Sequence, residues 1–302
     1  MEKNKGILYA IGAYVIWGLF PIYWKQLETI NALQIIGHRI GWSFILLILF
    51  VLITSQWGKF RAVAFNVKTI RIYLIAAVLI SLNWFTYVWA VTHDYVVESS
   101  LGYYINPLFS VLLGVIFFHE RLRSIQWIPI ALAAIGVIYL TAVYGSLPWI
   151  ALVLAFTFGL YGMVKKMAPL NSLHGLTLET GLLFLPALAY LVFCETTGQG
   201  AFLHSGALKD WMMVGAGLVT TVPLLLFSAA APRVPLTTIG ILQYVNPTMQ
   251  FLIGVLVYRE PFTHESLIGF GIVWAGLILF WVEGMYARKA IAPEPTPEMG
   301  EG

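Results

Sequence analysis

The sequence predicts an all-α membrane protein with ten transmembrane helices arranged as two inverted repeats of five helices. Three observations predict this fold: an apolar composition, ten long apolar stretches, and a motif that recurs after 140 residues. Of the 302 residues, 60% are hydrophobic and 10% are charged, whereas charged residues make up about 25% of a typical soluble domain. We therefore expect much of the chain to lie out of contact with water.

Ten stretches are long and apolar enough to cross a membrane as helices, which takes about 20 residues each. They are residues 7–26, 32–54, 71–92, 97–118, 125–143, 147–166, 175–196, 211–231, 236–258 and 264–286. The first stretch lacks an obvious small-residue cleavage site, so we expect it to be a membrane helix and not a signal peptide. The single cysteine, Cys194, cannot form a disulfide within the chain, and the net charge of +3 does not indicate nucleic-acid binding.

The second half of the chain repeats a motif of the first half. Residues 101–107 read Leu-Gly-Tyr-Tyr-Ile-Asn-Pro, and residues 241–247 read Ile-Leu-Gln-Tyr-Val-Asn-Pro. The same spacing relates Leu112/Leu252, Gly114/Gly254, Val115/Val255, Glu120/Glu260, Gly136/Gly276 and Ile138/Ile278. A duplicated apolar unit interrupted by proline is typical of transporters built from two repeats. We therefore divide the chain into a first repeat (1–144), a second repeat (145–286) and a cytoplasmic tail (287–302) predicted to be disordered.

Basic residues in the loops predict the orientation of the helices, because cytoplasmic loops are enriched in Lys and Arg. If the N-terminus is cytoplasmic, the inside loops hold thirteen of them: Lys3, Lys5, Lys59, Arg61, Lys68, Arg71, Arg121, Arg123, Lys165, Lys166, Arg233, Arg288 and Lys289. The outside ends hold three, Lys25, Lys209 and Arg259. We therefore predict that both termini are cytoplasmic. Since each half has an odd number of spans, the two halves are predicted to insert in opposite orientations.

Pro107 and Pro247 are the first candidates for a functional site, as matching helix breaks. A proline inside a helix removes a backbone hydrogen bond, and carbonyl groups freed in this way can face a cavity in a membrane bundle. Asn106 and Asn246 precede the two prolines. Two interpretations stay open: the prolines kink the helices for packing while the amides bond the freed carbonyls, or these residues line a substrate site.

Four ionisable side chains are candidates because charge inside a membrane is costly. Arg39 lies within the second span, where an arginine costs about 2.5–3.5 kcal/mol on insertion scales, and we expect it to face a cavity or a counter-charge. Lys25, at the outer end of the first span, either binds substrate with Arg39 or only reaches the membrane surface. Glu179 aligns with His38 at an offset of 141 residues. Both are candidates for proton coupling, and the alternative is a structural ion pair of Glu179 with Arg39 or His38.

Three further acidic residues are expected at helix ends. Glu98 begins a span, where a carboxylate is favoured by the helix dipole. Glu120 and Glu260 follow their spans and lie beside basic residues. We expect structural roles for all three.

Aromatic and amide side chains on the predicted inner helices are Tyr14, Trp17, Asn83, Trp84, Tyr87, Tyr103, Tyr104, Tyr161, Gln243 and Tyr244. From these we select Trp17, Asn83, Trp84, Tyr104, Gln243 and Tyr244 as substrate-binding candidates, although each aromatic ring has core packing as its alternative role. Such side chains suit an amphipathic organic solute, whereas an inorganic ion requires oxygen ligands. The sequence lacks a Walker loop, a His/Cys metal cluster and a nucleophile elbow, so we expect no ATP use, no metal, no cofactor and no enzymatic activity.

Several segments together resemble the EamA-type transporters of the drug/metabolite transporter superfamily and, within it, the RarD proteins. The segments are His38–Ser43, Asn83–Trp84 with Trp89–Val91, Ser100–Leu108, Gly145–Pro148, Glu179–Thr180, Thr220–Leu224 and Gln243–Tyr244. They extend from the second span to the ninth. The resemblance implies an inner-membrane permease with ten helices, two repeats and a central cavity open to alternate sides. Relatives include exporters of amino acids and other metabolites, and RarD proteins carry a name related to chloramphenicol.

The sequence therefore predicts a secondary permease that exports a small amphipathic organic solute, such as a metabolite, an amino-acid-like compound or a drug like chloramphenicol. Arg39, together with Lys25, would hold an anionic group of the solute. Protons are the candidate coupling ion, and downhill transport stays open. The alternatives from other classes are a membrane receptor or assembly factor without transport, and a membrane-embedded enzyme. The oligomeric state is not predicted.

Overall fold

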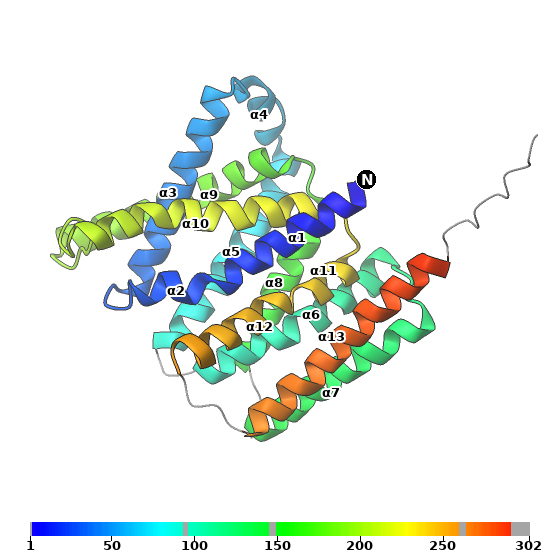
Figure 1. The fold of residues 1–302 in the computed structure, drawn as a ribbon. Helices are drawn as coiled ribbons and strands as arrows, with labels where there is room; N and C mark the ends of the chain where they lie inside the picture. The colour runs from blue at the N-terminus through cyan, green and yellow to red at the C-terminus, as the bar shows by residue number, and fades with distance from the viewer. Residues whose placement is uncertain (1, 93–95, 145–148, 260–263, 291–302) are drawn as a thin grey trace, which may run out of the picture.

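The computed structural model describes residues 2–92, 96–144, 149–259 and 264–290. Within this part of the chain the backbone forms helices joined by loops, without a β-strand (Figure 1). The helices are α1 (Glu2–Gly18), α2 (Phe20–Lys25), α3 (Ala32–Ile53), α4 (Trp57–Ala64), α5 (Val67–Thr92), α6 (Val96–Phe118), α7 (Trp127–Tyr144), α8 (Trp149–Met167), α9 (Ser172–Thr196), α10 (Ala207–Ala230), α11 (Leu236–Leu242), α12 (Val245–Leu252) and α13 (His264–Ala290), with a 3₁₀ turn η1 (Ser124–Gln126) and a π-helical turn η2 (Ile253–Val257). The predicted disordered tail begins at residue 287, but α13 continues to Ala290, and residues 291–302 lie outside the described part.

Seven helices among the described residues are long and apolar enough to cross a membrane. They are Asn4–Lys25, Ala32–Ile53, Val67–Tyr87, Ser124–Val143, Trp149–Met167, Ser172–Thr196 and Ala207–Ala230. The other three predicted spans, 97–118, 236–258 and 264–286, coincide with α6, with α11 to η2, and with α13. The chain is therefore a multi-pass helical membrane protein.

Two predicted spans are interrupted, and one loop contains an unexpected helix. The first span divides at Leu19 into α1 and α2, and Pro21 lies in the first turn of α2, where a missing N–H group costs little. The ninth span divides into α11 and α12. The loop between the second and third spans contains α4, which the sequence did not predict, and α5 begins at Val67, four residues earlier than expected.

The two repeat prolines differ in local structure, so the prediction of two matching helix breaks is wrong. Helix α6 continues through Pro107, whereas the ninth span is interrupted before Pro247, which is the third residue of α12. The first N–H groups of a helix have no partner within it, so a proline there removes no helical hydrogen bond. The interruption therefore lies at Gln243 and Tyr244, just ahead of Pro247.

Asparagine side chains begin helices α3 and α9 in the same way. The Asn31 Oδ1 atom accepts a hydrogen bond from the Leu33 backbone N–H at 2.9 Å. The Asn171 Oδ1 atom accepts one from the His174 backbone N–H, also at 2.9 Å. Asparagine is a preferred residue at this position because its oxygen satisfies an N–H group that has no helical partner. The two caps are separated by the same 140 residues that separate the sequence repeats.

The helices pack in corresponding pairs. Helix α3 packs against α9, α6 against α11, and α7 against α13. Other contacts also come in twos. Helix α5 packs against α8 as α10 packs against α1, and α6 packs against α8 as α12 packs against α1. In the same way, α3 packs against α10 and α9 packs against α5. Figure 1 shows α7 and α13 side by side at one edge of the bundle.

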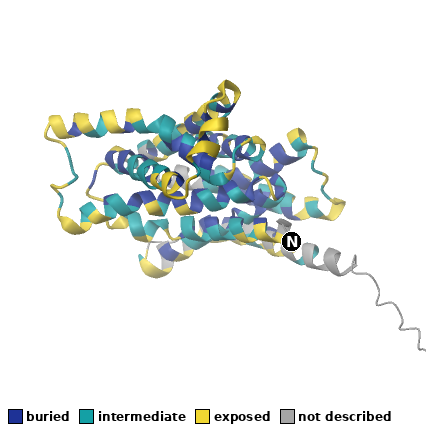
Figure 2. Cartoon of the chain, turned by 90° about the horizontal axis from the view of Figure 1, so that it is seen from above, coloured by how far each residue is buried: buried dark blue, intermediate teal, exposed yellow. Residues whose placement is uncertain are grey.

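The main core lies toward the end of the bundle where α8 ends and α11 begins. Its largest fully buried side chains include Tyr14, Tyr161, Phe227 and Leu236. Figure 2 shows buried residues gathered inside the bundle and exposed residues on its periphery. Many exposed side chains are large and apolar, and Ile53 is 80% exposed. Such outward-facing apolar side chains suit contact with lipid, since the helices satisfy their own backbone hydrogen bonds.

A central cavity as the candidate substrate site

A cavity of about 190 Å³ lies at the centre of the bundle, and both halves of the chain contribute to its lining. The lining residues are Trp17, Phe20, Pro21, Trp24, Arg39, Ile80, Asn83, Trp84, Tyr87, Gly102, Tyr103, Asn106, Leu154, Phe158, Leu224, Gln243, Asn246 and Gln250. Most of them belong to the half of the bundle in which α2 ends and α3, α6 and α8 begin. The cavity adjoins the main core, because Ile80 and Leu224 belong to both.

Arg39 of α3 provides the positive charge of the cavity. Its Nε atom donates a hydrogen bond to the Thr220 Oγ1 atom of α10 at 2.9 Å. Its guanidinium carbon lies 4.5 Å from the ring centroid of Trp84, 4.9 Å from that of Trp24 and 5.9 Å from that of Phe20. Aromatic rings stabilise a cation at these distances without neutralising its charge. Among the side chains that the structure describes, no carboxylate lies within ion-pair distance of Arg39.

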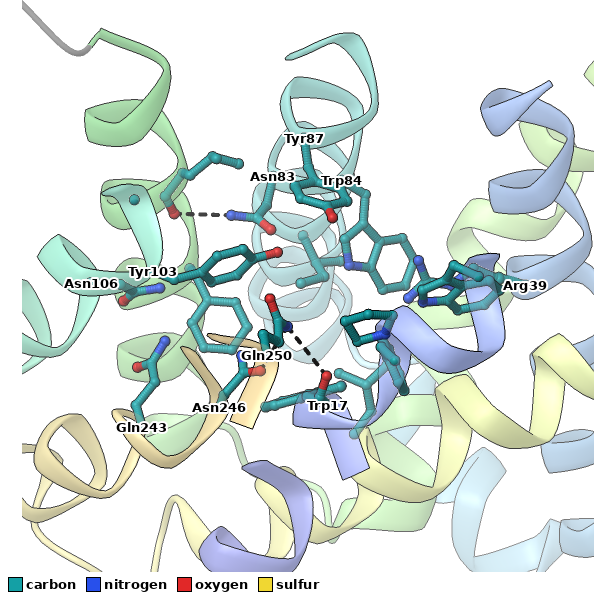
Figure 3. A pocket seen from close by; sticks show the side chains of 18 residues that line it. Trp17, Arg39, Asn83, Trp84, Tyr87, Tyr103, Asn106, Gln243, Asn246 and Gln250 are labelled. Atoms are coloured by element: carbon teal, nitrogen blue, oxygen red, sulfur yellow. Dashed lines mark hydrogen bonds between the residues drawn. The ribbon is translucent and has the colours of Figure 1, made fainter. Parts of the chain in front are cut away.

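Amide side chains occupy other parts of the cavity wall. Figure 3 shows Arg39 and Trp84 on one side of the cavity and Asn106 and Gln243 on the other. The Asn83 Nδ2 atom donates to the Leu154 carbonyl oxygen at 2.9 Å, which fixes the amide on α5 against α8. These groups can donate and accept hydrogen bonds, so the wall suits a solute with polar atoms at several positions.

A second pair of amides joins α12 to α1. The Gln250 Nε2 atom donates to the Asn246 Oδ1 atom at 2.8 Å and to the Trp17 carbonyl oxygen at 3.3 Å. The polar wall near Trp17 is therefore held by hydrogen bonds before any solute binds.

The repeat motif supplies the cavity with equivalent residues from both halves. Tyr103 and Gln243 both line it, as do Asn106 and Asn246. The structure thus places both asparagines at the cavity wall. Asn106 Oδ1 also accepts a long hydrogen bond of 3.5 Å from the Ser110 hydroxyl.

The structure brings together seven of the ten residues selected for substrate binding: Trp17, Arg39, Asn83, Trp84, Asn106, Gln243 and Asn246. Tyr104 and Tyr244 do not line the cavity; they are buried against each other. Lys25 does not line it either, because it pairs with Glu28 at the protein surface with an Nζ–Oε2 distance of 2.9 Å. The predicted cooperation of Lys25 with Arg39 is therefore not found.

His38 and Glu179, the two residues selected for proton coupling, lie apart from the cavity and from each other. His38 packs against the Phe202 ring, with 5.0 Å between ring centroids, and faces a second pocket beside α9. The Glu179 Oε2 atom accepts a hydrogen bond from Lys165 Nζ at 2.7 Å. The expected ion pair of Glu179 with Arg39 or His38 is therefore wrong. Lys165 was assigned to a loop, but it lies in the last turn of α8 and is buried.

Sequence reasoning missed several cavity residues. Phe20, Pro21 and Trp24 were overlooked because the division of the first span at Leu19 was not predicted. Gln250 carried a usable signal, since it lies one helical turn after Asn246 and is a polar residue within an apolar span. Phe158 offered none, because a phenylalanine in a membrane helix is equally typical of packing.

Glu120 connects the two halves outside the cavity. Its carboxylate accepts hydrogen bonds from the Leu236 N–H at 2.7 Å and the Thr237 N–H at 2.9 Å, at the start of α11. The Lys166 Nζ atom lies 3.3 Å from Glu120 Oε1. Burial alone would raise the pKa of Glu120, but these N–H groups and the charge of Lys166 together lower the pKa below its usual value. The expected anchoring role of Glu120 is confirmed, while Glu260 and the side chain of Glu98 lie outside the described part.

The profile of the EamA-like transporter family matches two consecutive segments, residues 4–142 and 147–282. The chain belongs to the EamA-like transporter family. The uncharacterized transporter YojE of Bacillus subtilis is 46% identical over 294 residues, which cover 96% of this chain and 97% of YojE. Protein RarD of Streptomyces exfoliatus is 43% identical over 292 residues, which cover 96% of this chain and 93% of that protein.

The predicted resemblance of this EamA-like transporter to EamA-type and RarD proteins is thereby confirmed. The fold also has a counterpart among solved structures. One crystal structure of a protein with 15% sequence identity superposes with a TM-score of 0.68, covering 93% of this chain and 98% of that chain. At that identity the similarity establishes a shared fold, while the relatives in sequence establish the family.

Proposed function

We propose that this EamA-like transporter is a secondary-active permease of the cell inner membrane that exports a small amphipathic organic solute with an anionic group, by alternating access. The main support for this proposal is the environment of the Arg39 side chain. Its guanidinium lies in the cavity among aromatic rings, and no carboxylate of the described side chains neutralises it. A charge inside a membrane protein without a counter-charge in the protein favours a ligand of opposite charge.

The shape of the guanidinium narrows the class of solute. Arginine binds carboxylates and phosphates through parallel N–H donors, and only the Nε donor of Arg39 is used by Thr220. Chloramphenicol carries no negative charge, so Arg39 favours an acidic metabolite or an amino-acid-like compound. The cavity of about 190 Å³ is smaller than the roughly 300–1,000 Å³ of drug-sized sites, which also favours a small solute.

Ten helices in two inverted repeats remain our proposal for the architecture. Aligning the halves at the repeat spacing makes α1–α2 equivalent to α8, α3 to α9, α5 to α10, α6 to α11–α12, and α7 to α13. Exchanging equivalent helices turns the pair α5–α8 into α10–α1 and the pair α3–α10 into α9–α5, and all of these pairs are in contact. A twofold relation in the membrane plane would produce this correspondence.

The proposed orientation places both termini in the cytoplasm. Lys165 no longer counts as a loop residue because it is buried in α8, which leaves twelve of the thirteen inside residues against three outside. The asymmetry still follows the positive-inside rule. In this orientation the cavity lies toward the outer face of the membrane and the main core closes the cytoplasmic side.

A proton gradient is the proposed energy source, with downhill transport as its alternative. Glu179 is the stronger candidate for carrying the proton, because it is an acidic side chain buried inside a span. His38 packs against Phe202 away from the solute cavity. Dependence of flux on a pH gradient would separate an antiporter from a facilitator.

Counterflow in proteoliposomes tests the proposed function. Radiolabelled amino acids and chloramphenicol are offered to the wild type, to Arg39→Ala and to the matched control Lys25→Ala. We expect exchange of at least one amino acid that falls about tenfold or more in Arg39→Ala and is unchanged in Lys25→Ala, since Lys25 lies at the surface. If the protein exchanges chloramphenicol alone, and Arg39→Ala leaves that exchange unchanged, the proposal of an anionic solute is wrong. Binding without any exchange by folded protein would favour a receptor.

A further inference from the structure

Five aromatic side chains close one end of the central cavity. They are Tyr14, Trp17, Phe158, Tyr161 and Phe227, which we call the aromatic layer. Trp17 and Phe158 line the cavity, and their rings lie 5.7 Å apart between centroids. Phe227 lies 5.7 Å from Trp17 and stacks on Tyr161 at 6.1 Å. The layer joins α1, α8 and α10, so an opening of the cavity toward this end must separate these three helices.

A buried ion pair lies next to the aromatic layer on the side away from the cavity. Lys165 Nζ and Glu179 Oε2 are 2.7 Å apart, and the two side chains are 3% and 2% exposed. Lys165 Nζ also lies 5.3 Å from the ring centroid of Tyr73 and 5.7 Å from that of Tyr161. The pair therefore joins α8 to α9, and Tyr161 belongs both to the aromatic layer and to the surroundings of the pair.

The polar groups around this pair are incompletely satisfied. Glu179 Oε1, the Tyr161 hydroxyl and the Ser228 hydroxyl are buried and have no hydrogen-bond partner among the described residues. Glu179 and Ser228 nevertheless lie beside the Tyr161 hydroxyl. Buried polar atoms without partners are costly, and a buried ion pair contributes little net stability compared with apolar packing. Stabilisation of the fold therefore does not explain why Lys165 and Glu179 are buried together.

The groups that face Glu179 come from several helices. Helix α8 supplies Lys165 and Tyr161, and α5 supplies Tyr73. Helix α10 supplies the Ser228 hydroxyl, which lies beside Tyr161. Helix α3 meets α9 through apolar contacts, with Leu191 against Gly37 and Phe44 against Gly181, and its His38 lies against Phe202 instead. Helix α4 approaches the first turn of α9, where Phe60 packs on His174 and Lys59 lies near that histidine.

We propose that Glu179 is a proton-binding site that controls the closure of the cavity at the aromatic layer. When Glu179 is ionised, it holds Lys165 and keeps α8 and α9 together beneath the layer. When Glu179 binds a proton, Lys165 loses its counter-charge. Because Lys165 lies in the last turn of α8, its long side chain can then extend to the aqueous end of the helix. The helices are released from each other, and the aromatic layer can separate.

This inference rests on the proposed function, because it assigns the aromatic layer to the cytoplasmic side of a carrier. It adds to that function a means by which a proton favours the cytoplasm-open conformation. Its test needs no transported solute, so a wrong solute class would leave the result intact.

Cysteine accessibility tests the proposal, and the single native cysteine makes the experiment practical. In a Cys194→Ala background, Ser228→Cys places a thiol of similar size beside Tyr161. Inside-out vesicles are treated with a membrane-impermeant maleimide, which reaches the cytoplasmic face. We expect slow labelling in this reference protein and labelling at least fivefold faster after Glu179→Gln, which mimics the protonated carboxyl group. Glu28→Gln, which removes an exposed ion pair, should leave the rate unchanged.

A second variant separates a released closure from simple loss of folding. Lys165→Met combined with Glu179→Leu replaces the ion pair by apolar side chains that can pack, so labelling should stay slow. In right-side-out vesicles, Glu179→Gln should not accelerate labelling. An unchanged rate in Glu179→Gln from the cytoplasmic face would overturn the proposal, and so would equal acceleration from both faces, since that indicates local unfolding.

Discussion

Tyr104 and Tyr244 occupy equivalent positions in the two halves of the chain and contact each other inside the bundle. The Tyr244 hydroxyl donates a hydrogen bond to the Tyr104 carbonyl oxygen at 3.2 Å, and the ring centroids lie 6.3 Å apart. Residues next to them in sequence, Tyr103 and Gln243, line the cavity from opposite halves. The tyrosine pair therefore sets the distance between the two halves directly beside the candidate substrate site.

Removing only the Tyr244 hydroxyl should weaken this contact without creating a cavity in the core. In Tyr244→Phe the Tyr104 carbonyl loses one donor but stays within the continuous helix α6, so we expect the protein to lose about 0.5–1.5 kcal/mol of stability. Tyr244→Ala should cost more, about 3–5 kcal/mol, because it also leaves a cavity. Thermal unfolding of the purified protein in detergent measures both. A Tyr244→Phe protein as stable as the wild type would show that the hydrogen bond is replaced or unimportant.

Gly240 of α11 should tolerate no side chain. A Cβ atom there would lie 2.6 Å from the Pro107 carbonyl oxygen of α6, a backbone atom that cannot move aside on its own. We expect Gly240→Ala to destabilise the protein by about 1–3 kcal/mol through overpacking. Gly41 of α3 is the matched control, since a Cβ atom there meets nothing within 4 Å.

Alanine at position 41 should be neutral or slightly stabilising, because alanine favours helices by up to about 1 kcal/mol over glycine. Equal melting temperatures for the two alanine variants would contradict the close packing of α6 on α11.

Glu120 should make the stability of the protein depend on pH in the acidic range. Its pKa is lowered in the folded protein, so its stabilising contribution is complete above the ordinary pKa of a glutamate and is lost as the pH falls through the lowered folded value. We expect the melting temperature of the wild type to fall with acidification over this window, and Glu120→Gln to flatten that part of the curve. At neutral pH the same change should cost about 1–3 kcal/mol, since the two N–H groups bind different carboxylate oxygens and the NH2 group that replaces one of them cannot accept a hydrogen bond.

Glu28→Gln is the control for this measurement, because Glu28 belongs to an exposed ion pair and such pairs contribute little. If Glu120→Gln follows the wild-type pH curve, the interaction with α11 does not control acid stability.

The composition and the repeat were enough to predict the helical membrane fold, because apolar stretches of about 20 residues are typical of transmembrane helices. The position of each helix break was harder to predict. Pro247 marked the ninth span as unusual, yet the interruption lies at Gln243 and Tyr244, because a proline is tolerated in the first turn of α12. The division at Leu19 had no proline at the break itself and was missed.

Part of the candidate site could be predicted from the sequence, because polar residues stand out in an apolar span. Arg39, Asn106 and Asn246 are polar residues in apolar surroundings, and the cost of placing them there pointed to an interior position. Lys165 has the same character but precedes a second lysine at a helix end, which is also the pattern of a loop. Only the structure shows that its side chain turns inward from α8 to Glu179 of α9.

Arg39 should not be replaceable by lysine, although lysine keeps the charge. The Arg39 side chain donates from Nε to Thr220 and places its guanidinium carbon over the rings of Trp84 and Trp24. An ammonium group offers neither the fixed donor nor a flat, delocalised charge. For the amino acid that the wild type exchanges best, we expect Arg39→Lys to lower counterflow about tenfold, close to Arg39→Ala. Thr220→Val, which keeps the guanidinium and removes only its acceptor, should lower counterflow less than Arg39→Lys does. Full activity of Arg39→Lys would mean that the site needs only a positive charge, and the geometry of the guanidinium would then carry no specificity.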